Sequence, residues 1–240
     1  MRIGAVVLLS CVLCAALAGS ACAQAQINAE TMDWSYKLDG VDLAQIHVVY
    51  PQISGLDEDV CRQINGAIKE FVVSQGGFDT ACEYARDDYA ESYQRFIETE
   101  RYGLDALARV ARNDRLLAVR YDFTLHTGGA HPWDTIAAQH YDLQTGALVP
   151  LSAMVDNWPA FQSRVVECIR RGKSAPRYED FTDDYVDIAQ WPERQGPLTA
   201  DGLLVFYQEG DLGPVSAGAF ELVIPYSMFE GMFLEGLGLP

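Results

Sequence analysis

Hydrophobic and polar residues alternate most regularly across the middle of the chain. Apolar side chains occupy every second position from Leu104 to Val110 and again from Leu117 to Leu125. A two-residue period is typical of a strand with one buried face, and Asn113-Asp114 between the runs favours a tight turn. The pattern therefore predicts an antiparallel hairpin over about residues 104–125.

Apolar residues follow helical spacing in two segments before this hairpin and in one after it. The first helix is expected to start near Leu56, with Asp57 as its N-terminal acid, and to end at Gly76-Gly77. The second is expected over about Thr80–Ile97 and the third near Pro159–Arg171. The apolar positions of the first helix are Leu56, Val60, Ile64, Ile68, Phe71 and Val72.

The remaining apolar runs are short and bounded by turn residues, which predicts further strands. These strands are expected at Ile46–Tyr50, Thr135–Leu143, Gly202–Tyr207 and Ala217–Ile224. Residues 172–196 are polar, acidic and poorly periodic, so we expect a long loop or insertion there. Strands joined by short turns, with helices elsewhere in the chain, indicate an α+β fold: one compact domain with an antiparallel sheet and two or three packed helices.

The first 23 residues are typical of a secretory signal peptide. Arg2 is followed by the uncharged apolar run Ile3–Ala18, and small residues then offer an Ala-x-Ala cleavage site at Ala21-Cys22-Ala23 or Ala23-Gln24-Ala25. A spanning helix needs about 20 apolar residues, and no second run of that length follows. We therefore expect an exported protein, periplasmic or secreted, with a domain over residues 24–240 and no transmembrane anchor in its mature form.

Cys22 raises the alternative of a lipid-anchored protein. The residues before it, Gly19-Ser20-Ala21, lack the large aliphatic residue expected three places upstream of a lipidated cysteine. A cleaved soluble form is therefore the expectation.

Net charge narrows the classes of partner. The 240 residues carry a net charge of −17, and removing the leader takes away Arg2 alone and leaves −18. Nucleic acids and anionic membrane surfaces repel such a protein, so neither is expected as a partner. The hydrophobic fraction of 49% excludes a disordered chain.

Three cysteines remain after the leader: Cys61, Cys82 and Cys168. In an oxidising compartment one disulfide would contribute about 3 kcal/mol, and any of three pairings is open. If Cys61 and Cys82 begin two consecutive antiparallel helices, they lie at opposite ends of that pair, which disfavours joining them. Three small buried thiols are the alternative interpretation.

Metal and enzyme motifs are weak or absent. His126, His131, Asp134 and His140 lie near one another in the sequence, but no short helical histidine pair is present to hold zinc. The zincin, phosphate-loop and dinucleotide fingerprints are missing, and Gly213–Gly218 is one residue too long for a nucleophile elbow. We expect no metal, no cofactor and no catalytic constellation. The acidic residues Glu179, Asp180, Asp183, Asp184 and Asp187 do not match a calcium loop.

Two segments together resemble a known family. The first runs from Tyr121 to Leu151 and contains TGGAH, residues 127–131, followed by YDLQTG, residues 141–146. The second is the pair LVFYQ, residues 204–208, and AGAFE, residues 217–221, before Ile224-Pro225-Tyr226. They resemble the extracytoplasmic domain of RsiV-type anti-sigma factors and the non-catalytic part of PdaC-type peptidoglycan deacetylases. The resemblance implies an α+β module outside the cytoplasmic membrane, which in the RsiV group binds lysozyme.

The chain departs from both groups. It lacks the transmembrane helix of an anti-sigma factor and has no room for a deacetylase domain, so only the module is carried over. The family loop is the candidate partner-binding site. Its residues are Thr127, Gly128, Gly129, Ala130, His131 and Trp133.

Two interpretations of this loop are open. In the structural one, the two glycines form a tight turn and His131, fixed by Pro132, packs on it. In the functional one, a rigid tip presents His131 and Trp133 to a partner, since loop tips carry recognition and Trp is enriched at binding hot spots.

The leading hypothesis is thus an exported, non-catalytic binding module for a protein or cell-wall ligand, with cationic lysozyme-type muramidases as candidates. The alternatives are a peptidoglycan-active enzyme or accessory factor that uses His131, and a structural envelope protein that uses its apolar C-terminus. For that C-terminal stripe core packing is the preferred interpretation. Its residues are Met228, Phe229, Met232, Phe233, Leu234 and Leu237.

Overall fold

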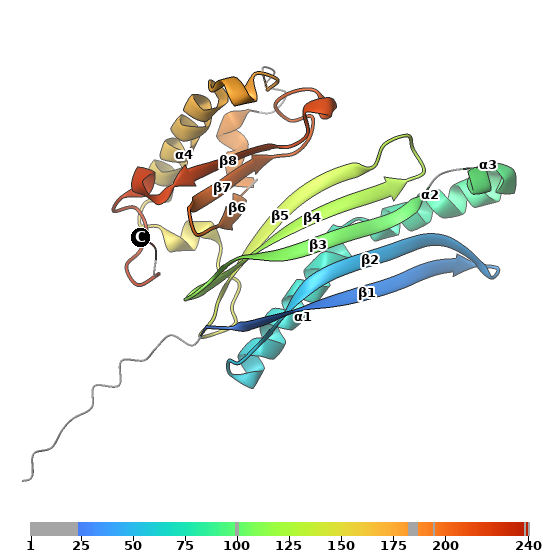
Figure 1. Cartoon of the computed structure of the whole chain (residues 1–240), viewed down its shortest axis with the longest axis horizontal. Helices are drawn as coiled ribbons and strands as arrows, with labels where there is room; N and C mark the ends of the chain where they lie inside the picture. Colours follow the sequence, from blue (N-terminus) through green and yellow to red (C-terminus); the bar gives the residue numbers. More distant parts are fainter. Residues whose placement is uncertain (1–23, 99–100, 182–186, 194, 238, 240) are drawn as a thin grey trace, which may run out of the picture.

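Two β-sheets organise the computed structural model, which describes residues 24–98, 101–181, 187–193, 195–237 and 239 (Figure 1). The first sheet has the order β1-β2-β3-β4-β5, with β1 Gln26–Leu38, β2 Val41–Ser54, β3 Tyr102–Asn113, β4 Leu116–Thr127 and β5 Trp133–Asp142. The second has the order β6-β7-β8, with β6 Gln195–Leu198, β7 Gly202–Tyr207 and β8 Phe220–Pro225. The predicted α+β fold is confirmed, and the second sheet is an addition to it.

The predicted central hairpin is β3 and β4. Leu104 faces Leu125 across the pair and Ala106 faces Phe123, so the apolar positions of both strands share one face of the sheet. The Asp114 carboxylate accepts the Leu116 N–H at 3.2 Å and so stabilises the turn between them. The two-residue period was sufficient to predict this hairpin, because the two paired strands follow one another directly in the chain.

The first sheet is not wholly antiparallel. β2 and β3 pair in parallel, with Ile46 opposite Leu104. Parallel neighbours need a long crossover, and the helices that follow β2 supply it. The edge strand β1 was not predicted, although its second half carries the signal: Met32, Trp34, Tyr36 and Leu38 alternate with polar residues.

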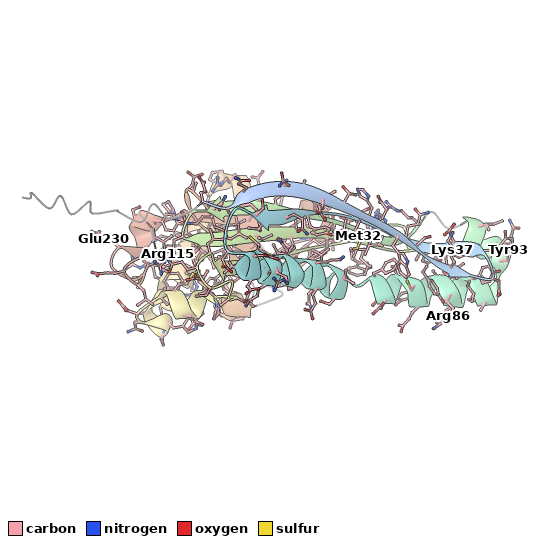
Figure 2. All side chains as sticks on the ribbon, turned by 90° about the horizontal axis from the view of Figure 1, so that it is seen from below. Met32, Lys37, Arg86, Tyr93, Arg115 and Glu230 are labelled. Atoms are coloured by element: carbon pink, nitrogen blue, oxygen red, sulfur yellow. The ribbon has the colours of Figure 1, made fainter. Side chains whose placement is uncertain are left out.

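Helices cover one face of the first sheet (Figure 2). Helix α1, Glu58–Gln75, starts where expected, since the Asp57 side chain accepts the N–H groups of Asp59 and Val60. The predicted helix over residues 80–97 is two helices, α2 Phe78–Glu91 and α3 Tyr93–Glu98, separated by the extended Ser92. α1 and α2 lie end to end, as Figures 1 and 2 both show, and do not form an antiparallel pair.

All three cysteines of the described domain are free thiols. Burial raises the pKa of Cys82 to about 11 and also raises the pKa of Cys168. Both thiols are therefore protonated at neutral pH and poorly reactive. Of the three cysteines expected as buried thiols in the alternative interpretation, Cys168 is buried, whereas Cys61 and Cys82 are half-buried.

A second core lies between the second sheet and α4, Trp158–Lys173. The inward positions predicted for this helix are all buried: Phe161, Val165, Cys168 and Ile169. Residues 172–196 were expected as a long loop or insertion, and residues 182–186 and 194 of this range lie outside the described residues. They contain the 3₁₀ helices η2 Pro176–Tyr178 and η3 Ile188–Glu193, and η3 places Trp191 fully inside this core.

The second sheet joins the first on the face that α1 and α2 leave open (Figure 1). Arg120 of β4 donates two hydrogen bonds to Glu221 of β8, at 2.5 and 2.8 Å. The Leu198 N–H of β6 donates to Nε2 of His140 on β5 at 3.0 Å. Arg112 of β3 also donates to the Tyr226 hydroxyl at 3.2 Å, so the contact involves β3, β4 and β5.

Residues 1–23 lie outside the described residues, and with them the expected signal peptide and Cys22. Among the described helices, none is long and apolar enough to span a membrane.

The C-terminal stripe packs on the second core. Phe229 is 1% exposed and stacks on Phe161 at a centroid distance of 4.7 Å, whereas Leu234 is 40% exposed. We therefore expect Phe229→Ala to lower the free energy of unfolding by about 3–5 kcal/mol. Leu234→Ala is the matched control, with an expected loss below about 1 kcal/mol. Urea unfolding measures both, and equal losses would contradict a core role for Phe229.

Candidate functional site

The loop that joins β4 to β5 stands at one end of the first sheet. The parallel pairing of β2 with β3 brings the Asp39-Gly40 turn to the same end, and α3 lies there too (Figure 1). The loop contains every residue predicted for partner binding. Thr127 and Gly128 are half-buried, whereas Gly129, Ala130, His131 and Trp133 are exposed.

Gly128 has a structural role in this loop. Its φ of 76° lies in the left-handed region, and its N–H donates to the Arg101 carbonyl at 3.0 Å. A Cβ at this position would lie 2.4 Å from the Tyr102 ring. The Tyr102 hydroxyl in turn donates to the Asp88 carboxylate of α2. The loop is therefore fixed at its base by a close glycine–tyrosine contact.

The tip beyond Gly128 points into solvent. Trp133 is 62% exposed, although it begins a strand and faces Leu125 on β4. His131 is exposed too. Asp134 next to it accepts a hydrogen bond from the Thr124 hydroxyl at 2.6 Å. The loop thus presents an aromatic and an imidazole side chain on an anchored hairpin.

Polar side chains from separate strands gather on the open face beside this loop. The Asp105 carboxylate binds Nη1 of Arg101 at 2.7 Å and Nε2 of His126 at 3.1 Å. Nδ1 of His47 lies 2.6 Å from the Asp33 carboxylate on β1. Asp33, His47, Arg101 and Asp105 were not among the predicted site residues. The available signal was that Asp33, His47 and Asp105 occupy polar positions between apolar ones, but only the pairing of the strands brings them together.

These groups pair with one another and form no metal centre. Within the described residues, no group of three or more His, Cys, Asp or Glu side chains is placed to hold an ion. The zinc candidates are dispersed, with His126 paired to Asp105 and His140 buried under β6. Of the acidic residues considered for calcium, Asp183 and Asp184 lie outside the described residues. What the surface offers is exposed charge and hydrogen-bonding capacity.

His140 is a structural histidine. It is 4% exposed, and burial lowers its pKa to about 4. It is therefore neutral at pH 7, and its Nε2 accepts the Leu198 N–H. Its role is to join β5 to β6.

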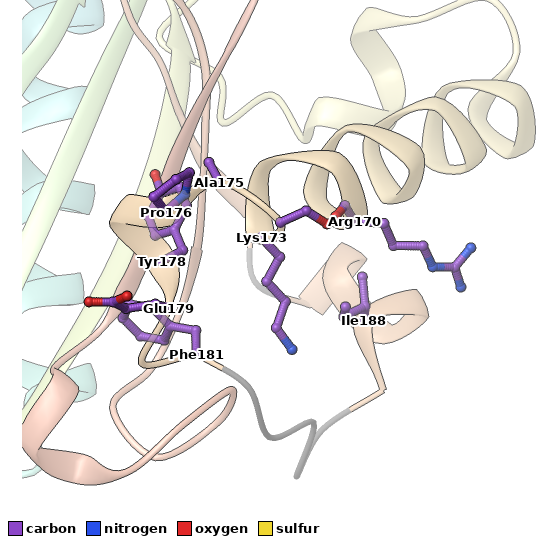
Figure 3. A pocket seen from close by; sticks show the side chains of 9 residues that line it. Arg170, Lys173, Ala175, Pro176, Tyr178, Glu179, Phe181 and Ile188 are labelled. Atoms are coloured by element: carbon purple, nitrogen blue, oxygen red, sulfur yellow. Dashed lines mark hydrogen bonds between the residues drawn. The ribbon is translucent and has the colours of Figure 1, made fainter.

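A hollow of about 570 Å³ lies at the C-terminal end of α4 (Figure 3). Tyr178 and Phe181 line it on one side and Ile188 on another, and Lys173 extends between them while the Glu179 carboxylate points away. Residues 164–177 carry five basic side chains and one acid, Glu167. Cations in the last turn of α4 are favoured by the helix dipole, so this charge has a structural explanation.

Two adjacent glycines test the anchoring of the loop. Gly128→Ala should lower the free energy of unfolding by about 2 kcal/mol or more. The left-handed φ is unfavourable for alanine, and the added Cβ would clash with the Tyr102 ring. Gly129 does not have a positive φ, and a Cβ there would meet the His131 carbonyl oxygen at 3.9 Å, an ordinary contact. For Gly129→Ala a change within about 0.5 kcal/mol is therefore expected. Urea denaturation compares the two, and a similar loss for both would contradict the anchor.

The pH dependence of stability tests His140. Its pKa falls from 6.5 to about 4 on folding, so the unfolded chain binds the extra proton and stability is lost as pH falls below 6.5. Between about pH 7 and about pH 5 this group should remove about 2 kcal/mol. His140→Gln should lack that part of the pH dependence and His131→Gln should retain it. Parallel profiles for all three proteins would contradict the assignment.

Comparison with known proteins supports the fold and leaves activity open. Residues 176–227 match the family model "Protein of unknown function (DUF3298)". No curated protein matches the chain in sequence. A crystal structure of a DUF3298 family member from Bacteroides fragilis is 18% identical, with a TM-score of 0.60 over 89% of this chain and 95% of that one. A DUF3298 family protein from Pseudomonas aeruginosa is 19% identical, with a TM-score of 0.60 over 90% and 97%. At these identities the likeness shows that the chain has the fold of DUF3298 family proteins.

Proposed function

We propose that this chain is an exported, non-catalytic binding module whose β4–β5 loop engages a protein or cell-wall ligand. The observation that carries the proposal is the exposure of Trp133 on an anchored hairpin. A large aromatic side chain loses apolar contact with water when a partner covers it, and Trp is enriched among residues that dominate binding energies.

The anchoring of the loop favours binding further. Gly128 is held by the Arg101 carbonyl and the Tyr102 ring, so the tip does not have to be ordered when a partner arrives. Binding by an ordered loop avoids part of the entropy that a flexible loop loses. The polar group of Asp105, Arg101 and His126 lies on the other face of the sheet, since Trp133 shares the face of Leu125 and Leu104.

Charge favours a cationic protein as the partner. A net charge of −17 attracts positively charged proteins over long range and raises their association rate at low salt. The resemblance of the TGGAH and C-terminal strand motifs to the RsiV and PdaC domain supports lysozyme-type muramidases as the first candidates. Export through the leader at residues 1–23 would bring the protein to the compartment where such enzymes act.

Titration with a cationic lysozyme at low and moderate salt tests this proposal. We expect a dissociation constant tighter than about 1 mM at moderate salt, and Trp133→Ala should weaken it about tenfold or more. Trp34→Ala is the matched control, because Trp34 is 58% exposed on β1, the opposite edge of the sheet.

Three results would count against the proposal. Absence of binding at both salt concentrations would remove lysozyme as the partner, and binding that disappears at moderate salt would be nonspecific charge attraction. Equal weakening of lysozyme binding by Trp133→Ala and Trp34→Ala would show that the β4–β5 loop is not the binding site. Turnover of muropeptides that His131→Ala abolishes would identify an enzyme instead.

A further inference from the structure

The outer edge of β5 is only partly covered. The Ile136 N–H donates to Oε1 of Gln208 and its carbonyl accepts from Nε2 of the same side chain, both at 2.9 Å. Two rungs further along, the His140 carbonyl accepts the Val149 N–H at 2.8 Å. Alternate residues of a strand direct their backbone groups to the same edge. Ala138, between these two, therefore directs its N–H and carbonyl to that outer edge.

The pairing of β3 with β4 leads to the same orientation. The bond from the Gly128 N–H to the Arg101 carbonyl flanks the opposed residues Tyr102 and Thr127, so that pair is a non-hydrogen-bonded one. The backbone groups of Thr127 therefore point toward β5, and so do those of every second residue before it, including Tyr121. Tyr121 and Ala137 thus form a hydrogen-bonded pair, and the backbone N–H and carbonyl of the next residue, Ala138, point away from β4. Within the described residues, no side chain or loop group hydrogen-bonds to the Ala138 backbone on its outer side.

On either side of Ala138, other groups already make the hydrogen bonds that a neighbouring strand would make. The Gln208 amide supplies one acceptor and one donor to Ile136, as a paired strand residue would. Leu148, next to Val149, forms an isolated antiparallel bridge with Tyr141. Pro150 then ends this pairing, because it has no N–H and leads into the 3₁₀ helix that starts at Leu151. The hydrogen bonding along this edge of β5 therefore has a gap at Ala138, between the partners of Ile136 and His140.

A hollow of about 420 Å³ surrounds this gap. Phe71 of α1 and Leu148 line it on the side of the helices, and Phe206 of β7 lines it on the side of the second sheet. A strand placed at this edge would thus find apolar contacts for side chains on both of its faces. Ala138 itself is small and half-buried, so its side chain leaves the edge accessible.

We propose that the edge of β5 at Ala138 binds a short extended peptide by strand addition. The central residue of the peptide exchanges two backbone hydrogen bonds with Ala138, and its side chain faces Phe206. The two flanking residues direct their side chains toward Phe71 and Leu148. Gln208 and Val149 occupy the next rungs, about 13 Å apart along the strand, so the paired segment is three residues long.

The site differs from the β4–β5 loop and shares no residue with it. It goes beyond the proposed function by adding a second binding site, with an extended peptide as its ligand class. The two proposals have separate tests, because peptide binding is measured at Ala138 without lysozyme. Failure of one therefore leaves the other standing.

The test uses acetyl-Val-Ala-Val-amide and the same peptide methylated on the nitrogen of its central alanine. Nuclear magnetic resonance follows the Ala138 amide of the whole exported chain during each titration. We expect a saturable shift of that amide at peptide concentrations below about 10 mM. N-methylation removes the peptide N–H that Ala138 accepts, so the affinity should fall threefold or more. No saturable shift, or a loss smaller than threefold, would overturn the proposal.

A protein variant tests the hollow independently. Leu148 is exposed and belongs to neither core, so Leu148→Ser should fold and weaken peptide binding threefold or more. Val215→Ser, at a similarly exposed valine outside the hollow, is the matched control and should leave the affinity unchanged. Equal affinities for both variants would show that the peptide does not enter this hollow.

Discussion

The ion pair between Arg120 and Glu221 is the contact on which the arrangement of the two sheets depends. It places two hydrogen bonds across the junction, and the bond to Glu221 raises the pKa of Arg120, so the guanidinium stays charged. Arg112 adds a second link as a nearly buried cation that donates to the Tyr226 hydroxyl at 3.2 Å. A partly buried charge that loses its partner is costly, so removing either side of these links would loosen the whole junction.

The position of this junction decides which surfaces remain accessible. The second sheet covers the open face at β4, at β5 and at the Arg112 end of β3. It leaves the other end of β3 uncovered, where Asp105 pairs with Arg101 and His126. It also stops short of the outer edge of β5, where Gln208 satisfies Ile136 but does not reach Ala138. Both proposed binding surfaces are therefore parts of the first sheet that the second sheet leaves uncovered.

The two surfaces suit different kinds of ligand. The β4–β5 loop presents Trp133 on a convex tip, which fits a folded partner with a complementary surface. The β5 edge at Ala138 offers backbone groups inside a hollow, which fits an extended chain. Neither surface relies on a metal or a nucleophile, and the thiols of Cys82 and Cys168 are protonated at neutral pH.

By itself the sequence determined the features that depend on neighbours in the chain. The β3–β4 hairpin, the start of α1 at Asp57 and the inward face of α4 follow from periodicity and local capping. Only the tertiary structure decided the parallel pairing of β2 with β3, the polar group around Asp105 and the gap in hydrogen bonding at Ala138. Each of these depends on strand register and on contacts between distant segments, which leave no pattern in any single stretch of residues.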